Sequence, residues 1–396
     1  MTDKHLNIGL FGFGNVGHAL YRLLEQMNDP RVTIRRVCVH NLDKKRDVEA
    51  DFTDNADDIF NDSEINFIVE LIDNADASFD IVSRALRSGR PVVTGNKKML
   101  ARHLEELIGL QRQTGTGLLY DASACGSIPV IRNLEEYYDN DLLISLKGIL
   151  NGSSNYVLSK VFNENMSYSQ ALAQATAAGF VESDPSLDID GWDALYKLVI
   201  VTVHAFGTYV APERIFCYGI GNMNDDDIRF ANEKDRRVKL VAHVEKLGSG
   251  KLVMCVMPQL LSRNKYIYSV EDEFNGVVIK GRYYDKQFMF GRGAGGFPTA
   301  SAVLSDITAS LHDYRYEYKK RNESVMPAYT ADVVFRIYMR YSTPMDLSVL
   351  KFEEISESYN SDTYNYVVGR VSLANLISVR EQLHRRGVFL AAYPRD

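Results

Sequence analysis

Residues 6–17 read LNIGLFGFGNVG, and this stretch decides the fold of the first part of the chain. Its first half is an apolar run with the length of a buried strand, and the residues after it repeat apolar side chains at helical spacing. Between the two, Gly12, Gly14 and Gly17 have the G-x-G-x-x-G spacing. The first glycine permits a tight turn, the second lets the backbone approach a pyrophosphate, and the third lets the helix pack closely on the strand. This succession of strand, spacing and helix predicts a dinucleotide-binding turn.

Strands and helices continue to alternate over the first third of the chain. Such alternation indicates parallel βαβ units in a doubly wound, Rossmann-type sheet, so the expected fold class is α/β. We expect the dinucleotide-binding domain to cover residues 1–130, with residues 300–325 returning to it. Its further strands are predicted at 33–39, 66–72 and 91–94, and a helix at 78–88. The residues expected to contact the dinucleotide in the turn are Gly12, Phe13, Gly14, Asn15, Val16 and Gly17.

From residue 148 onward the pattern changes to that of two α+β regions. Residues 131–299 are predicted to form a substrate-binding and dimerisation domain, and residues 329–396 a small C-terminal module that resembles a shortened ACT-type regulatory domain. The predicted helices are 167–178, 192–206, 300–311 and 373–386, and the predicted strands are 252–257, 276–280, 333–341, 364–372 and 388–393.

The composition excludes several classes of function. The formal net charge is −7 and there is no dense basic run, whereas nucleic-acid binding needs a concentrated positive surface. The longest apolar run near the start is too short to span a bilayer and lacks the flanks of a signal peptide, so we expect a cytoplasmic protein with no membrane partner. The 4 cysteines are widely separated, which indicates neither a disulfide framework nor a zinc site. Small-molecule chemistry is therefore favoured.

The end of the second predicted strand bears on the choice of dinucleotide. An acidic residue there binds the ribose hydroxyl of NAD and repels the phosphate of NADP. Residues 37–46 read VCVHNLDKKR, so no acid follows the strand directly, and His40 and three basic side chains lie close by. The sequence favours NADP, with His40 as a contact, and leaves NAD open. A solvated loop with no role in binding is the alternative interpretation.

Residues 179–197 read GFVESDPSLDIDGWDALYK and concentrate acids before a lysine. An acid-rich helix N-terminus with Asp193 and Lys197 as an exposed i,i+4 pair would explain them structurally. The run LVIVTVHAF that follows Lys197 is strongly apolar, however, so this lysine borders a buried face in the predicted helix. Hydride transfer to an aldehyde leaves an alkoxide that needs a proton, and a lysine can supply it.

Six further segments in this order resemble homoserine dehydrogenases, and with the glycine turn they cover most of the first 310 residues. Several long motifs in the right order are far more specific than any one of them. The segments are VVTGNKKML at 92–100, YDASACGSIPVIRNL at 120–134, GILNGSSNYVL at 148–158, GFVESDPSLDIDGWDALYK at 179–197, EFNGVVIKG at 273–281 and GRGAGGFPTASAVLSDI at 291–307.

The resemblance implies an NAD(P)-dependent oxidoreductase that interconverts L-aspartate 4-semialdehyde and L-homoserine on the route to threonine, methionine and isoleucine. It implies a homodimer formed through the substrate domain, and a monofunctional form because no kinase domain precedes residue 1. Lys197 matches the proton donor, and Lys97 matches an active-site lysine near cofactor and substrate. The positions that match substrate-binding residues are Gly179, Glu182, Asp188 and Asp193.

The segment DASACGSIP resembles a loop that binds a monovalent cation, usually Na⁺, through hard oxygen ligands. The matching positions are Asp121, Ala124, Gly126 and Ile128. Asp121 stands where the family normally has glutamate, so its side chain is one methylene shorter, and a purely structural loop is the alternative.

The chain departs from the family again at residues 73–74, where Asp-Asn replaces a pair of glycines. Within GRGAGGFPT we expect Gly293 to touch the cofactor, against a simple glycine-rich turn before a helix. Two other functions remain open at this point: another Rossmann-fold amino acid dehydrogenase, and a non-catalytic sensor of dinucleotide or amino acid.

Overall fold

The computed structural model describes residues 4–140, 142–180, 185–322 and 326–395. The chain divides into two compact units, and each is described here by itself. Unit 1 runs to Tyr137 and includes Arg292–Lys319, and unit 2 comprises the other described residues. Among the helices of the described ranges, none is both long enough and apolar enough to cross a membrane.

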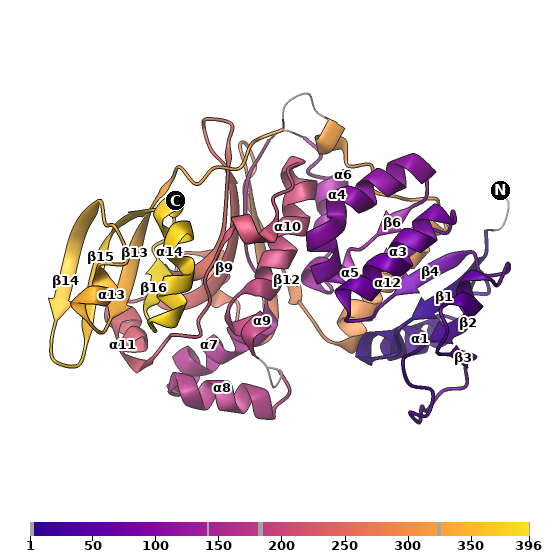
Figure 1. The fold of residues 1–396 in the computed structure, drawn as a ribbon, viewed down its shortest axis with the longest axis horizontal. Coiled ribbons are helices and arrows are strands. Elements are labelled where there is room, and N and C mark those ends of the chain that lie inside the picture. Colours follow the sequence, from indigo (N-terminus) through magenta and orange to yellow (C-terminus); the bar gives the residue numbers. More distant parts are fainter. Residues whose placement is uncertain (1–3, 141, 181–184, 323–325, 396) are drawn as a thin grey trace. The chain divides into compact units, whose positions relative to one another are not determined.

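Unit 1 is built on a six-stranded sheet in the order β3-β2-β1-β4-β5-β6, and every pair of neighbours is parallel. This is the doubly wound arrangement that the sequence predicts. Helix α1 packs on α12, and α3 packs on α4 (Figure 1). The strands are β1 (Leu6–Phe11), β2 (Val32–Cys38), β3 (Phe52–Thr53), β4 (Phe67–Glu70), β5 (Val92–Thr94) and β6 (Leu118–Leu119). The helices are α1 (Asn15–Met27), α2 (Asp57–Phe60), α3 (Ala75–Arg87), α4 (Lys97–Thr114), α5 (Ala122–Cys125), α6 (Val130–Glu136) and α12 (Gly296–Ser310).

Unit 2 is built on a ten-stranded sheet in the order β12-β11-β7-β9-β10-β16-β13-β15-β14, with β8 paired to β10. The strands are β7 (Leu143–Ile149), β8 (Phe216–Cys217), β9 (Arg237–Lys246), β10 (Leu252–Leu261), β11 (Phe274–Gly281), β12 (Asp285–Arg292), β13 (Val334–Tyr341), β14 (Glu354–Asn360), β15 (Asn365–Ser372) and β16 (Phe389–Ala392). The helices are α7 (Gly152–Glu164), α8 (Tyr168–Ala177), α9 (Ser186–Ile189), α10 (Trp192–Phe206), α11 (Asp225–Glu233), α13 (Pro344–Leu347) and α14 (Leu373–Arg385).

The C-terminal strands continue the sheet of unit 2. Strand β16 pairs with both β10 and β13, and Met257 of β10 lies in one hydrophobic core with Ile337 and Met339 of β13. Residues 320–396 accordingly belong to the second compact unit. The likeness of residues 329–396 to an ACT module stays a prediction.

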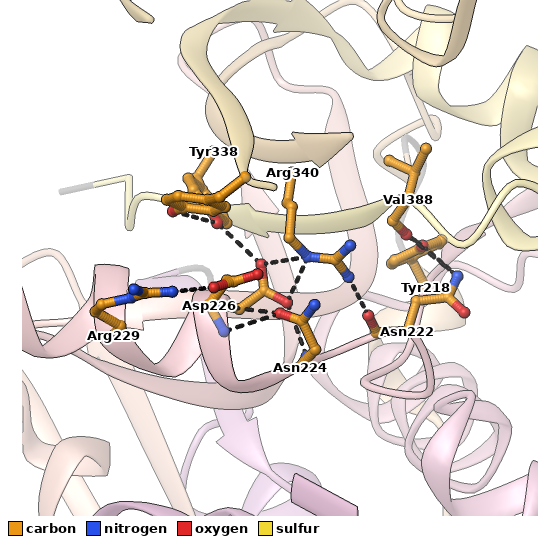
Figure 2. Close-up of polar contacts among 10 residues, drawn as sticks. Tyr218, Asn222, Asn224, Asp226, Arg229, Tyr338, Arg340 and Val388 are labelled. Atoms are coloured by element: carbon orange, nitrogen blue, oxygen red, sulfur yellow. Dashed lines mark hydrogen bonds and ion pairs between the residues drawn. The ribbon is translucent and has the colours of Figure 1, made fainter. Parts of the chain in front are cut away.

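A buried polar network joins α11 to β13 (Figure 2). Both carboxylate oxygens of Asp227 accept hydrogen bonds from Arg340 Nε, each at 3.0 Å, and Oδ1 also accepts one from the Tyr338 hydroxyl at 2.9 Å. Arg340 Nη2 donates to the Asn222 carbonyl at 2.5 Å. Burial raises the pKa of Asp227 to about 6, although Arg340 lowers it in turn. The carboxylate is therefore stable in the apolar interior only because the guanidinium lies against it.

We predict that Arg340→Met lowers the free energy of unfolding of unit 2 by about 3–5 kcal/mol, because Asp227 is left buried without its cation. The pKa of Asp227 is already above its unfolded value of 3.8, so the folded variant must hold a proton there. Relative to the parent, its stability should be greatest below about pH 4 and should fall as the pH rises toward the folded pKa, which lies above the parent's value of about 6 because Arg340 no longer lowers it. Urea unfolding at several pH values measures this, and Arg340→Met/Asp227→Asn is the control that should recover part of the loss.

Candidate functional site

The turn between β1 and α1 has the geometry expected of a dinucleotide-binding turn. Gly12 has a φ of +93°, and a Cβ there would lie 2.6 Å from the carbonyl oxygen of Leu71. A Cβ on Gly17 would lie 2.3 Å from the carbonyl oxygen of Gly12, so only glycine lets α1 start this close to β1. A Cβ on Gly14 would meet no heavy atom of the described chain within 4 Å. The first and third glycines therefore serve the fold, and the second keeps the surface open for a ligand.

A cavity of about 430 Å³ opens beside this turn, within unit 1. Its walls combine the start of α1, the loop after β2 and the start of α12. The residues that line it are Phe13, Gly14, Asn15, His18, Ala19, Lys44, Lys45, Arg46, Asp47, Gly296 and Phe297. A cavity that adjoins a helix N-terminus and carries three basic side chains suits an anionic ligand.

The basic side chains of this cavity differ in how they are held. The Arg46 guanidinium donates to the carbonyl oxygens of Asn41 and Lys44 at 2.7 and 2.8 Å and lies 4.7 Å from the ring centroid of Phe52. Lys44 and Lys45 are exposed. His40, the predicted contact, directly follows Val39 after β2 and is also exposed.

Two glycines of the GRGAGG segment lie in close backbone contacts within unit 1. A Cβ on Gly126 would lie 2.6 Å from the carbonyl carbon of Gly293, which makes Gly293 a neighbour of the 121–128 loop. A Cβ on Gly296 would lie 3.0 Å from the carbonyl oxygen of Asn15. Gly296 thus adjoins the dinucleotide turn, and the contact of Gly293 with the cofactor stays a prediction.

The carboxylate of Asp121 is buried and engaged by the protein itself. Its Oδ1 accepts hydrogen bonds from the backbone N–H groups of Ile131 and Arg132, at 3.0 and 3.2 Å. Its own N–H donates to Asp306 Oδ2 at 2.9 Å, and Asp306 Oδ1 accepts from Arg132 Nη2 at 2.6 Å. Burial raises the pKa of both carboxyl groups, and the charge of Asp306 raises that of Asp121 further. Arg132 compensates the charge that remains.

Lys97 is the first residue of α4, at the carboxyl end of the parallel strand β5. The Asn96 side chain caps α4 by accepting from the Met99 N–H at 2.9 Å, and it also donates to the Ile72 carbonyl at 3.0 Å. Behind this loop, buried Glu70 accepts from the Ile72 N–H at 2.7 Å and from the hydroxyl groups of Ser78 on α3 and Thr94 on β5. Lys97 therefore lies at the edge where ligands of open parallel sheets generally bind.

In unit 2, Lys197 and Asp193 form a buried ion pair on α10. Their side chains are 8% and 7% exposed, and Lys197 Nζ lies 2.8 Å from Asp193 Oδ2. The same Nζ donates to the carbonyl oxygen of Leu150 at 2.7 Å. The exposed surface pair that the sequence leaves open as an alternative is therefore ruled out, because both charges lie inside the unit.

Asn151, the N-cap residue of α7, fixes the carboxylates around Lys197. Its Oδ1 accepts from the Ser154 N–H at 2.8 Å, which leaves its amide N–H groups facing the acids. Nδ2 donates to Asp188 Oδ1 at 2.6 Å and to Asp193 Oδ2 at 2.9 Å. Burial and the nearby Asp193 raise the pKa of Asp188, whereas Asn151 and Lys197 lower it. One amide thus holds two carboxylates within reach of one ammonium group.

The structure brings two of the four predicted substrate residues together at the Asn151 amide, and one of the four lies outside the described residues. Asp188 and Asp193 come together, and Gly179 follows α8 with a φ of +76°. Glu182 lies outside the described residues. Sequence reasoning missed Asn151, although the motif NGSS, an asparagine before a helix start, is the signal of an N-cap.

Comparison with known proteins gives one consistent result. A family model described as homoserine dehydrogenase matches residues 129–308, and one described as its NAD-binding domain matches residues 12–121. The homoserine dehydrogenase of Bacillus subtilis is 32% identical over 322 residues, which cover 79% of this chain and 74% of the relative.

Solved structures agree with these matches. The homoserine dehydrogenase of Thiobacillus denitrificans has a TM-score of 0.85 and 26% identity, over 99% of this chain and 98% of that one. A hyperthermophilic archaeal homoserine dehydrogenase mutant in complex with NADPH has a TM-score of 0.68 and 26% identity, over 79% and 99% of the two chains.

We predict that two alanine substitutions in the glycine turn affect different properties, one the stability of unit 1 and the other dinucleotide binding. Gly17→Ala forces backbone apart and should destabilise unit 1 by about 1–3 kcal/mol. Gly14→Ala meets no clash and should change stability by less than about 0.5 kcal/mol, yet weaken dinucleotide binding by about tenfold because its methyl group occupies the approach of the pyrophosphate. Thermal unfolding and fluorescence titration measure the two effects. Equal dinucleotide affinity in Gly14→Ala and the parent would contradict this assignment.

Proposed function

The chain belongs to the homoserine dehydrogenase family, and from this we propose that Lys197 is the residue that moves the proton when the hydride is transferred. The enzyme is a nicotinamide-dinucleotide-dependent oxidoreductase of amino acid biosynthesis, and it interconverts L-aspartate 4-semialdehyde and L-homoserine. The observation that carries the proposal is the buried contact of Lys197 with Asp193 and with the Leu150 carbonyl.

The geometry of Lys197 suits a directed proton donor. An ammonium group has three N–H donors, and contacts within the described residues engage two of them. Because these two contacts fix the amine, its remaining N–H has a defined direction. A bound dinucleotide would supply hydride to the aldehyde carbon, and this N–H would protonate the alkoxide that forms on the substrate oxygen. In the reverse reaction the neutral amine takes the proton back.

The two carboxylates beside Lys197 suit the ammonium group of the amino acid substrate. Asp188 and Asp193 share the amide of Asn151, and together they carry one more negative charge than the single lysine neutralises. A substrate ammonium restores the balance, so binding also relieves the repulsion between the acids. Glu182 and Gly179 remain proposed substrate contacts on the family resemblance.

For the dinucleotide we propose NADP as the preferred form. Lys44, Lys45 and Arg46 line the cavity beside the glycine turn, and the loop that carries them follows β2, where the adenosine ribose binds in this fold. Three basic side chains at this place favour NADP, because they can bind the 2′-phosphate that NAD lacks. Lys97 is proposed as a further contact at the opposite end of the cofactor.

A monovalent cation at the 121–128 loop remains a proposal from the family resemblance. Asp121 Oδ1 is engaged by two N–H groups of α6, and the Ile128 carbonyl accepts from the Val130 N–H at 2.7 Å. Among the described residues, the oxygens with capacity for Na⁺ are Asp121 Oδ2, the carbonyls of Ala124 and Gly126, and the Ile128 carbonyl through its second lone pair. Oxygen atoms of this kind are the ligands that such a cation prefers. The Asp121 carboxylate is already stabilised without a cation, because two N–H groups of α6 donate to it.

We also propose a homodimer formed through unit 2. Strand β12 is an edge of the ten-stranded sheet, and Phe290 on this strand is 53% exposed. Nearby aromatic side chains are also open to solvent, with Tyr283 at 79% and Tyr266 at 51%. Exposed aromatic groups along an unpaired edge favour association with a second copy.

The first test replaces the lysine and its partner. We predict that Lys197→Met lowers kcat by about 10²–10⁴-fold and destabilises unit 2 by about 3–5 kcal/mol, because the proton donor is lost and Asp193 is left buried without a cation. The double variant Lys197→Met/Asp193→Asn should regain stability and remain inactive. Steady-state rates with homoserine and thermal unfolding give the two values. A single variant with kcat near that of the parent would refute the role of Lys197.

The second test concerns the cofactor. Lys44→Ala/Lys45→Ala should raise KM for NADPH by about tenfold or more, since a charge-assisted contact with a phosphate contributes about 1.5–3 kcal/mol, and should leave KM for NADH unchanged. Lys4→Ala is the control, because Lys4 pairs with Asp313 and does not line the cavity. An equal change for both cofactors would show that the two lysines do not distinguish them.

A further inference from the structure

Strand β11 carries a buried polar side chain that has no partner. Asn275 is 0% exposed, and neither Oδ1 nor Nδ2 makes a hydrogen bond to any described residue. A buried amide without partners is costly, and a native protein retains one where a ligand or an ordered water completes it.

The strand register places this amide on the face of the sheet that α10 covers. A Cβ on Gly191, the N-cap residue of α10, would touch Val256 of β10. Val256 pairs with Ala242, Ala242 with Gly148, and Gly148 with Val277 of β11. Directly paired residues project to the same face, and so do residues two apart on a strand. Asn275 therefore projects toward α10, the helix of Lys197 and Asp193.

The strand register also fixes the position of Asn275 along β11. Gly276 pairs with Ile149, so Asn275 lies beside Leu150, whose carbonyl oxygen holds Lys197 Nζ. The backbones are also close at the next residue, since a Cβ on Gly152 would lie 2.5 Å from the carbonyl oxygen of Glu273. The unpaired amide thus adjoins the dipeptide, Leu150 and Asn151, that arranges the lysine and the acids.

We propose that Asn275 binds the reacting oxygen of the substrate. This rests on the proposed role of Lys197, because the oxygen that receives its proton is the one that Asn275 would reach. The Asn275 amide N–H donates to the carbonyl oxygen of the semialdehyde, and it stabilises the negative charge that develops there as hydride reaches the carbon. No proton leaves the amide, since Lys197 supplies it. The substrate oxygen then has two hydrogen-bond donors, the neutral amide of Asn275 and the charged ammonium group of Lys197.

The decisive variant is Asn275→Leu, which keeps a similar shape and removes both polar atoms. We expect kcat to fall by about 100-fold with KM for homoserine little changed, since the contact strengthens in the transition state. The thermal midpoint should stay the same or rise by about 2–4 °C, because an unsatisfied buried group has been removed. A kcat like that of the parent, or a loss of kcat together with a lower thermal midpoint, would overturn the proposal.

Gln259→Met is the matched control. Gln259 is a buried amide on β10 with an unpartnered Oε1, and it lines a cavity with Lys147 and Val278. Val278 adjoins Val277 on β11, so this cavity lies on the opposite face of the sheet. The control should leave kcat unchanged, because this amide lies on the face of the sheet away from Lys197. If it lost activity as Asn275→Leu does, the effect would not be specific to the Lys197 face.

Asn275→Asp provides a test that does not depend on packing. The carboxyl group has the size of the amide, and at this buried place its pKa is raised, so it donates a hydrogen bond only when protonated. Activity relative to the parent should therefore recover as the pH is lowered. A ratio to the parent that does not change with pH would contradict the donor role. Lys197→Met, measured in parallel, separates failure of this proposal from failure of the lysine assignment.

Discussion

The buried ion pair of Lys197 and Asp193 is the constraint on which the rest of unit 2 depends. Two opposite charges inside a protein lose their hydration, and their mutual attraction compensates for this only if the other donors and acceptors are also satisfied. The backbone carbonyl of Leu150 and the amide of Asn151 supply those contacts. The lysine can be kept inside the unit because the end of β7 and the start of α7 meet at these two residues.

Further hydrogen bonds along α7 hold Leu150 and Asn151, the junction of β7 and α7, in position. Asn155, one turn after Asn151, donates to the Asp272 carbonyl at 2.8 Å and accepts from buried Lys239 at 2.9 Å. Burial lowers the pKa of Lys239 to about 8, and Glu271 raises it in turn. Helix α7 is thus attached to β9 and to the segment before β11, so the Asn151 amide cannot turn away from the two acids without breaking a buried network.

The sequence was sufficient to predict the features that depend on local pattern. The glycine turn, the alternation of unit 1 and the pairing of Asp193 with Lys197 all follow from spacing within a few residues, and the structure confirms them. What depends on strand pairing could not be predicted. Gly296 reaches Asn15 only because α12 packs on α1, and Asn275 reaches the Lys197 face only through the register of β11 on β7. The long helix α4 was also missed, although its leucines recur at helical spacing.

Asn151 and Asn275 in unit 2 differ in how the protein uses a buried amide. Asn151 has both ends of its amide engaged by the protein, so it orders the carboxylates and has no capacity left for a ligand. Asn275 is as deeply buried and has both ends free within the described chain. A fully paired amide stabilises the folded state, whereas an unpaired one lowers its stability until something binds. A ligand bound at Asn275 could recover the stability that the unpaired amide costs, and this amide adjoins Leu150, whose carbonyl oxygen accepts from Lys197.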